Sequence, residues 1–105
     1  MFKNGSEPLT LTRVQLIIAD TYSQKDSARG VEGTFMWLME EVGELSAALR
    51  EKDQNALAAE FADVLAWLAT LANVTGVNLD KAFQEKYGAG CPGCHQIPCS
   101  CQAKP

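Results

Sequence analysis

The sequence predicts an all-α fold, a small four-helix bundle, from three observations. Apolar residues recur at helical spacing in successive stretches of the chain. The apolar content depends mainly on Ala and Leu, which favour helices over strands. Aromatic residues make up only 8% of the 105 residues, and the chain length suits one domain.

The first helix is expected from about residue 10 to 24, after a polar lead-in at residues 1–8 that contains Gly and Pro. Its apolar positions are Leu11, Val14, Ile17 and Ile18. The polar stretch 25–33 carries two glycines and lacks helical periodicity, so it is predicted to be a loop.

The second helix is expected from Thr34, which can cap it, to about residue 50. The apolar stripe consists of Phe35, Leu38, Val42, Leu45 and Leu49. Gly43 interrupts this helix at a cost of about 1 kcal/mol relative to Ala, and we interpret it as a mark of close contact with another helix.

Two further helices are expected after a short hinge, EKDQN, at residues 51–55. The third covers about residues 54–75, and its apolar face consists of Leu57, Val64, Trp67, Leu68 and Leu71. The fourth, residues 79–87, follows a capping Asn78 and stops at the sequence GAG. These short connections favour antiparallel neighbours, so residues 9–88 are predicted to be one helical domain, followed by a Cys-rich tail at 89–105.

Acidic residues lie on the inner sides of the second and third expected helices. On a helical wheel, Glu60 falls among the apolar residues of its helix, and Asp63 lies about 60° away. A carboxylate is costly to bury unless it is paired or bound to a metal. If the two helices pack antiparallel, four carboxylates converge and supply the oxygen ligands that Mg²⁺ or Mn²⁺ prefers: Glu41, Glu44, Glu60 and Asp63.

The alternative is that these acids are exposed and contribute solubility through contacts along the helix. We accept that interpretation for Glu40, which points away from the others on the wheel. Redox di-iron chemistry is set aside because it usually needs E-x-x-H pairs, and the one His of this chain is in the tail.

The sequences EEVGEL at 40–45 and EFADVLAWL at 60–68 resemble the MazG-type all-α nucleoside triphosphate pyrophosphohydrolases. The signature of that family is E-E-x-x-E followed by E-x-x-D, and the resemblance extends over about residues 9–87. It implies Mg²⁺-dependent hydrolysis of a nucleoside triphosphate to its monophosphate and pyrophosphate, as in nucleotide-pool house-cleaning. It also implies that the four convergent acids are metal ligands and catalytic residues, with Glu40 in an outer or structural role.

Candidate substrate contacts lie near the motif. Phosphate groups would be bound by Lys81, Lys86 or Arg29, and a base would stack on Trp37 or Trp67. The alternatives are a solvated cationic face and tryptophans that belong to the core. The family often has more basic residues and an Asn after the fourth helix, where this chain reads KYGAGCPGC instead.

The tail sequence GCPGCHQIPCSC is predicted to be a zinc knot with Cys91, Cys94, Cys99 and Cys101 as ligands. His95 is an alternative ligand. Disulfides within the tail, or a tail without any ligand, are open alternatives. CPGCH also fits the haem-attachment pattern, but that chemistry occurs in export compartments and the N-terminus lacks the apolar segment of a signal peptide.

The formal net charge of −4 argues against a nucleic acid polymer as partner. The longest apolar run, residues 64–74, is shorter than the roughly 20 residues that a membrane span needs, so a cytoplasmic protein is expected. A thin core predicts a homodimer or homotetramer. Two other functions stay open: phosphoribosyl-ATP pyrophosphohydrolase activity, and a non-catalytic sensor of metal or nucleotide.

Overall fold

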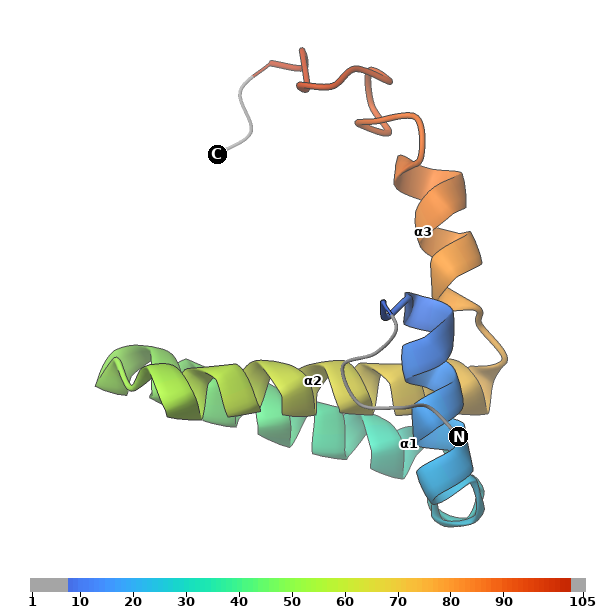
Figure 1. Ribbon diagram of the computed structural model, residues 1–105, viewed down its shortest axis with the longest axis vertical. Coiled ribbons are helices and arrows are strands. Elements are labelled where there is room, and N and C mark those ends of the chain that lie inside the picture. The colour runs from blue at the N-terminus through green and yellow to red at the C-terminus, as the bar shows by residue number, and fades with distance from the viewer. Residues whose placement is uncertain (1–7, 103–105) are drawn as a thin grey trace.

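A computed structural model describes residues 8–102, so residues 1–7 of the expected lead-in and the last three residues of the tail lie outside the described part. This part contains three helices and no strand: α1 (Leu11–Glu51), α2 (Gln54–Thr75) and α3 (Leu79–Tyr87) (Figure 1). The all-α prediction is confirmed. The expected four-helix bundle is not confirmed, because the first two expected helices are continuous across a break at one glycine and α3 points away from the body (Figure 1).

Helix α1 breaks at Gly30, whose backbone angles are φ 82° and ψ −178°. We call residues 11–29 the first arm and residues 31–51 the second arm. The predicted loop at 25–33 is therefore wrong, since these residues are helical on both sides of a single non-helical glycine. The second arm runs antiparallel to α2, while the first arm lies beside the C-terminal end of α2 (Figure 1).

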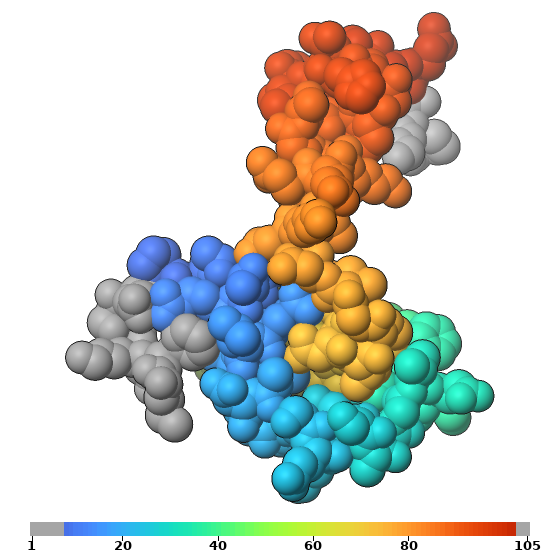
Figure 2. Space-filling model, turned by 90° about the vertical axis from the view of Figure 1, so that its right-hand side faces the viewer, coloured from blue at the N-terminus to red at the C-terminus, as the bar shows by residue number. Residues whose placement is uncertain are grey.

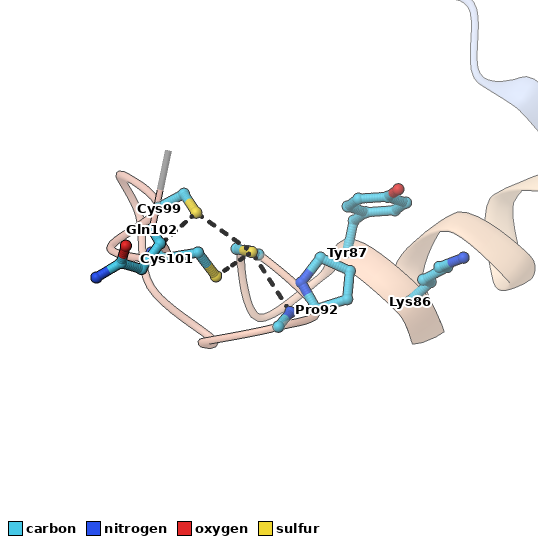
Figure 3. Close-up of a pocket in the computed structure, with 8 residues that line it drawn as sticks. Lys86, Tyr87, Pro92, Cys99, Cys101 and Gln102 are labelled. Carbon is cyan, nitrogen blue, oxygen red and sulfur yellow. Dashed lines mark hydrogen bonds between the residues drawn. The ribbon is translucent and has the colours of Figure 1, made fainter. Parts of the chain in front are cut away.

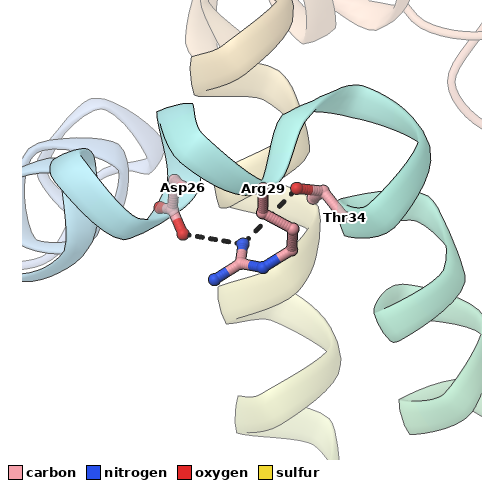
Figure 4. Close-up of polar contacts among 3 residues, drawn as sticks. All are labelled: Asp26, Arg29 and Thr34. Carbon is pink, nitrogen blue, oxygen red and sulfur yellow. Dashed lines mark hydrogen bonds and ion pairs between the residues drawn. The ribbon is translucent and has the colours of Figure 1, made fainter.

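Three polar side chains connect the two arms across the break (Figure 4). The Arg29 guanidinium donates from Nη1 to Asp26 at 2.9 Å and to Thr34 at 3.4 Å. Asp26 and Thr34 are both buried, at 4% and 0% exposure. Thr34 is therefore a buried contact inside α1 and not the helix cap that the sequence suggested.

Capping residues set the ends of α2 and α3, and Asn78 is the cap that was predicted from the sequence. The Asp53 side chain accepts from the amides of Asn55 and Ala56 and begins α2, so the expected five-residue hinge is reduced to Lys52 and Asp53. Gly76, with φ 76°, ends α2. Asn78 accepts from the Lys81 amide at 2.9 Å and begins α3. The predicted bounds of α2 and α3 are confirmed.

A buried glutamine attaches the first arm to the connection between α2 and α3. Gln15 donates from Nε2 to Asn73 at 3.0 Å and to the Val77 carbonyl at 2.8 Å, and its Oε1 accepts from the Leu79 amide at 2.8 Å. The Thr12 amide also donates to the Asp80 carboxylate at 2.9 Å. These bonds hold the start of α3, whose remainder extends with the tail away from the body (Figure 2).

The hydrophobic core within this part of the chain is thin. Its buried apolar residues are Ile18, Leu38, Ala48, Ala69 and Ala72. The radius of gyration is 16.2 Å, whereas a compact chain of this length would have about 13 Å. The expected stripe of the second arm is only partly buried, since Phe35, Val42 and Leu49 are exposed. Gly43 does not mark a close contact, because an added Cβ would meet no atom within 4 Å.

Helix α2 is long and apolar enough, by length and composition alone, to be a candidate membrane span. Only the apolar run 64–74 was considered in the sequence, and it is too short to span a membrane, so this candidate span was not predicted. The helix carries Glu60 and Asp63, and acidic groups are costly in a lipid-facing helix. One side of α2 lies along the second arm of α1, but only 17% of its apolar window is buried, so contacts within this chain cover part of its apolar surface.

Substitution of Gly30 by Ala should destabilise the fold by about 1–3 kcal/mol, because this backbone conformation is accessible essentially to glycine alone. Gly43→Ala is the matched control in the same helix, and it should stabilise by about 1 kcal/mol because Gly43 is helical with open space around it. Urea denaturation followed by circular dichroism measures both free energies of unfolding. Equal effects of the two substitutions would contradict a break at Gly30.

Candidate functional site

Three carboxylates meet where the second arm of α1 packs against α2. One carboxylate oxygen each from Glu41, Glu60 and Asp63 lies within 4.8 Å of the other two. Glu60 and Asp63 share one side of α2 because they are three residues apart in a helix. The antiparallel second arm brings Glu41 opposite them, so side chains distant in the sequence form one cluster of oxygen ligands.

The cluster is electrostatically unfavourable when it stands alone. Burial raises the pKa of Glu60, and the charges of Glu41 and Asp63 raise it further. Burial followed by the charge of Asp63 raises the pKa of Glu41 in the same way, while a hydrogen bond from the Trp67 side chain acts in the opposite direction. Glu60 Oε2 is buried and has no hydrogen-bond partner among the described residues. A divalent cation would offset both the repulsion and the missing hydrogen bond, and these all-oxygen ligands suit a hard ion such as Mg²⁺.

The other two glutamates of the motif lie outside this three-carboxylate cluster. Glu44 is exposed, yet its charge contributes to the raised pKa of both Glu41 and Glu60. Glu40 is exposed as well, and it lines a shallow hollow with Trp37. A role for Glu44 as a fourth ligand stays a prediction.

A pocket of about 250 Å³ lies between the first arm of α1 and α2. The first arm contributes Ile18, Tyr22, Lys25, Asp26 and Arg29, and α2 contributes Asp63, Ala66, Trp67 and Thr70. Asp63 belongs both to this pocket and to the three-carboxylate cluster. A ligand in the pocket would therefore adjoin the cation that the cluster can hold.

Aromatic rings and a guanidinium group lie beside the acids. The rings of Trp37 and Trp67 stack with their centroids 5.9 Å apart and their planes 15° apart. The Arg29 Cζ lies 4.7 Å from the Trp67 ring centroid, within the range of a cation–π contact. Since Asp26 also holds this guanidinium (Figure 4), Arg29 is fixed at the pocket.

Sequence reasoning missed Lys25 as a pocket residue because it assigned a loop from residue 25, and it missed Tyr22 because this residue is outside the apolar positions assigned to the first helix. Helical spacing was a usable signal, since Ile18, Tyr22 and Arg29 continue one face of the first arm. The predicted substrate contacts Lys81 and Lys86 lie on α3, and neither lines this pocket.

The four cysteines of the tail form a second cluster of metal-ligand type. Their sulfur atoms all lie within 4.8 Å of one another. Hydrogen bonds from the side chain and amide of Ser100 lower the pKa of Cys94 to about 6, and hydrogen bonds from the amides of Cys94 and Gly93 lower that of Cys91. Hydrogen bonding with Cys99 and the other two sulfurs raises the pKa of Cys101 to about 11.

Comparison with known families gives a match. The family described as the MazG nucleotide pyrophosphohydrolase domain matches residues 29–95, which is more than half of the 105-residue chain. The matched range begins at Arg29 and includes all three acids of the cluster. A search of curated proteins found no match.

Mg²⁺ or Mn²⁺ should raise the thermal unfolding midpoint of the protein, because the ion would relieve the repulsion among the three carboxylates. Without a divalent ion, Glu60→Gln should unfold at the same temperature as the unsubstituted chain or higher, since it removes one of the repelling charges. Addition of Mg²⁺ should raise the unfolding midpoint of Glu60→Gln much less than that of the unsubstituted chain. Glu51→Gln, at the end of α1, is the control and should respond to Mg²⁺ like the unsubstituted chain. Equal gains for all three proteins would exclude the cluster as the cation site.

Proposed function

Because the chain belongs to the MazG nucleotide pyrophosphohydrolase family, we propose that it hydrolyses nucleoside triphosphates to the monophosphate and pyrophosphate with Mg²⁺. In this reaction the oxygen of water forms a bond to one phosphorus, the anhydride bond between the α and β phosphates breaks, and one proton is released. The observation that supports it best is the cluster of Glu41, Glu60 and Asp63 directly beside a pocket containing Arg29 and Trp67. Such a reaction would remove unwanted triphosphates from the nucleotide pool.

Glu41, Glu60 and Asp63 would hold the ion, with Glu44 as a further candidate ligand from the motif. Mg²⁺, or Mn²⁺ in its place, would supply positive charge that offsets the charge of the phosphate oxygens and makes water easier to deprotonate. The carboxylates hold negative charge at fixed positions and can orient the attacking water or accept its proton. The reaction needs no covalent nucleophile.

The pocket residues have separate roles in the proposal. Arg29 uses Nη1 for Asp26 and Thr34, so its remaining N–H groups are available for the oxygens of a phosphate chain. Lys25 adds a second positive charge to the same pocket. Trp67 lines the pocket and offers an apolar ring for a nucleobase, and Trp37, which is outside the pocket lining, stacks on that ring. Roles for Lys81 and Lys86 in substrate binding stay predictions from the sequence.

A second copy of the chain is the partner we propose for the exposed apolar surface. Each of the two antiparallel helices exposes large apolar residues at helical spacing: Phe35, Met39, Val42 and Leu49 on the second arm, and Phe61, Leu65 and Leu68 on α2. Apolar stripes of this kind usually mark an interface. A homodimer or homotetramer would cover this surface. We propose that it is located in the cytoplasm, near its nucleotide substrates.

A panel of nucleoside triphosphates assayed with Mg²⁺ should show pyrophosphate and monophosphate in equal amounts. Glu60→Gln should lower kcat/KM about a hundredfold or more because it removes a metal ligand, while Glu51→Gln should retain the activity. The panel includes phosphoribosyl-ATP, and turnover of that compound alone would replace the proposed substrate. Binding without release of pyrophosphate would favour the sensor, and release of phosphate with a diphosphate would exclude the proposed bond cleavage.

Sedimentation equilibrium should give a mass of at least twice the 11.4 kDa of one chain. Leu65→Lys should shift the protein towards the monomer because it places a charge in the apolar stripe of α2. Leu9→Lys is the control, since Leu9 is exposed but precedes α1. A mass of one chain for the unsubstituted protein would contradict self-association through these stripes.

A further inference from the structure

We propose that the tail binds one structural Zn²⁺ through the four sulfur atoms of Cys91, Cys94, Cys99 and Cys101. The site lies beyond the end of α3, at the part of the chain that extends from the body (Figures 1 and 2). It is separate from the carboxylate cluster in position and in ligand chemistry. The proposal therefore does not depend on the hydrolytic function.

The distances between the sulfur atoms fit a tetrahedral zinc site. Zinc–sulfur bonds of about 2.3 Å at tetrahedral angles place the sulfurs about 3.8 Å apart. Cys91 Sγ lies 3.5 Å from Cys99 Sγ and 3.7 Å from Cys101 Sγ, and Cys94 Sγ lies 3.9 Å from Cys99 Sγ. Figure 3 shows Cys99 and Cys101 directed towards the same point. A disulfide would need two sulfurs at about 2 Å, so this arrangement favours a shared ion over sulfur pairs.

Backbone amides surround the sulfurs as an outer shell. Gly93 N–H donates to Cys91 Sγ at 3.4 Å, and Ser100 N–H donates to Cys94 Sγ at 3.3 Å. Cys101 N–H donates to Cys99 Sγ at 3.3 Å. Hydrogen bonds of this kind orient ligands and stabilise the thiolate form that zinc requires. Three of the four sulfurs thus have a fixed direction as well as a fixed position.

The described tail has little else to hold it in one conformation. Residues 91–102 contain no helix or strand, and most of their side chains are exposed. Two backbone bonds shape the turn, from His95 N–H to the Cys91 carbonyl and from Cys91 N–H to the Gln96 carbonyl. A segment this short cannot bury enough apolar surface to fold alone, so metal binding would supply the folding free energy.

The ligand set favours zinc over magnesium and excludes one predicted alternative ligand. Thiolates are soft ligands that favour Zn²⁺ over Mg²⁺, so the ion proposed for the acids does not compete here. His95 was an alternative ligand in the sequence, but the group of converging atoms consists of the four sulfurs without its ring. Four protein ligands close the coordination sphere, which is typical of structural and not catalytic zinc.

Metal analysis of the full-length protein, purified in a reducing buffer, should find about one zinc per chain. The double substitution Cys99→Ser and Cys101→Ser should reduce this to near zero, while circular dichroism shows the helices intact. His95→Asn is the matched control, chosen because Asn tolerates the positive φ of 59° at this position, and it should retain the zinc. Glu60→Gln should also retain it, which separates this result from any loss of hydrolysis.

Hydrogen exchange measured by mass spectrometry gives an independent readout in the unsubstituted chain. Chelation of zinc should speed exchange at the amides of Gly93, Ser100 and Cys101, and leave α1 and α2 unchanged. Two disulfides without metal, iron in place of zinc in the isolated protein, or loss of zinc in His95→Asn would each overturn the assignment.

Discussion

The break at Gly30 is the constraint on which the arrangement of the site depends. A continuous 41-residue helix would extend far past α2 and could not contact it from two directions. The single residue with φ 82° lets the first arm lie against the C-terminal end of α2 while the second arm runs along its length. Arg29 connects the arms and also lies over Trp67, so the residue that holds the break is part of the pocket.

Antiparallel packing concentrates negative charge where the two long helices meet. Glu41 and Glu60 are partly buried together, which raises the pKa of both carboxyls and opposes folding in the absence of a cation. This cost to folding is explained if the protein uses the ion for its function and not for stability alone. The same acids that destabilise the two packed helices could hold a hard cation, next to a pocket with a fixed guanidinium.

The two clusters of metal-ligand type differ in ligand chemistry and in their place in the fold. The acids come from α1 and α2, which must pack before the oxygens meet. The sulfurs come from eleven consecutive residues, 91–101, that follow α3 and need only a local turn to converge. Hard oxygen and soft sulfur ligands select different ions, so the two clusters would not compete for the same metal.

The sequence by itself determined the helical class, the bounds of α2 and α3, and the cap Asn78, because these depend on spacing and on local hydrogen bonds. It also indicated which acids share a side of α2. The tertiary structure decided that residues 25–33 are helical around one glycine, that Thr34 is buried, and that Lys25 and Tyr22 line a pocket. The direction of α3 away from the body could not be predicted from the sequence either. It depends on hydrogen bonds that Gln15 and Asp80 make to residues more than 60 positions away. Local patterns specify an element, but only packing between distant segments specifies which polar residues it buries.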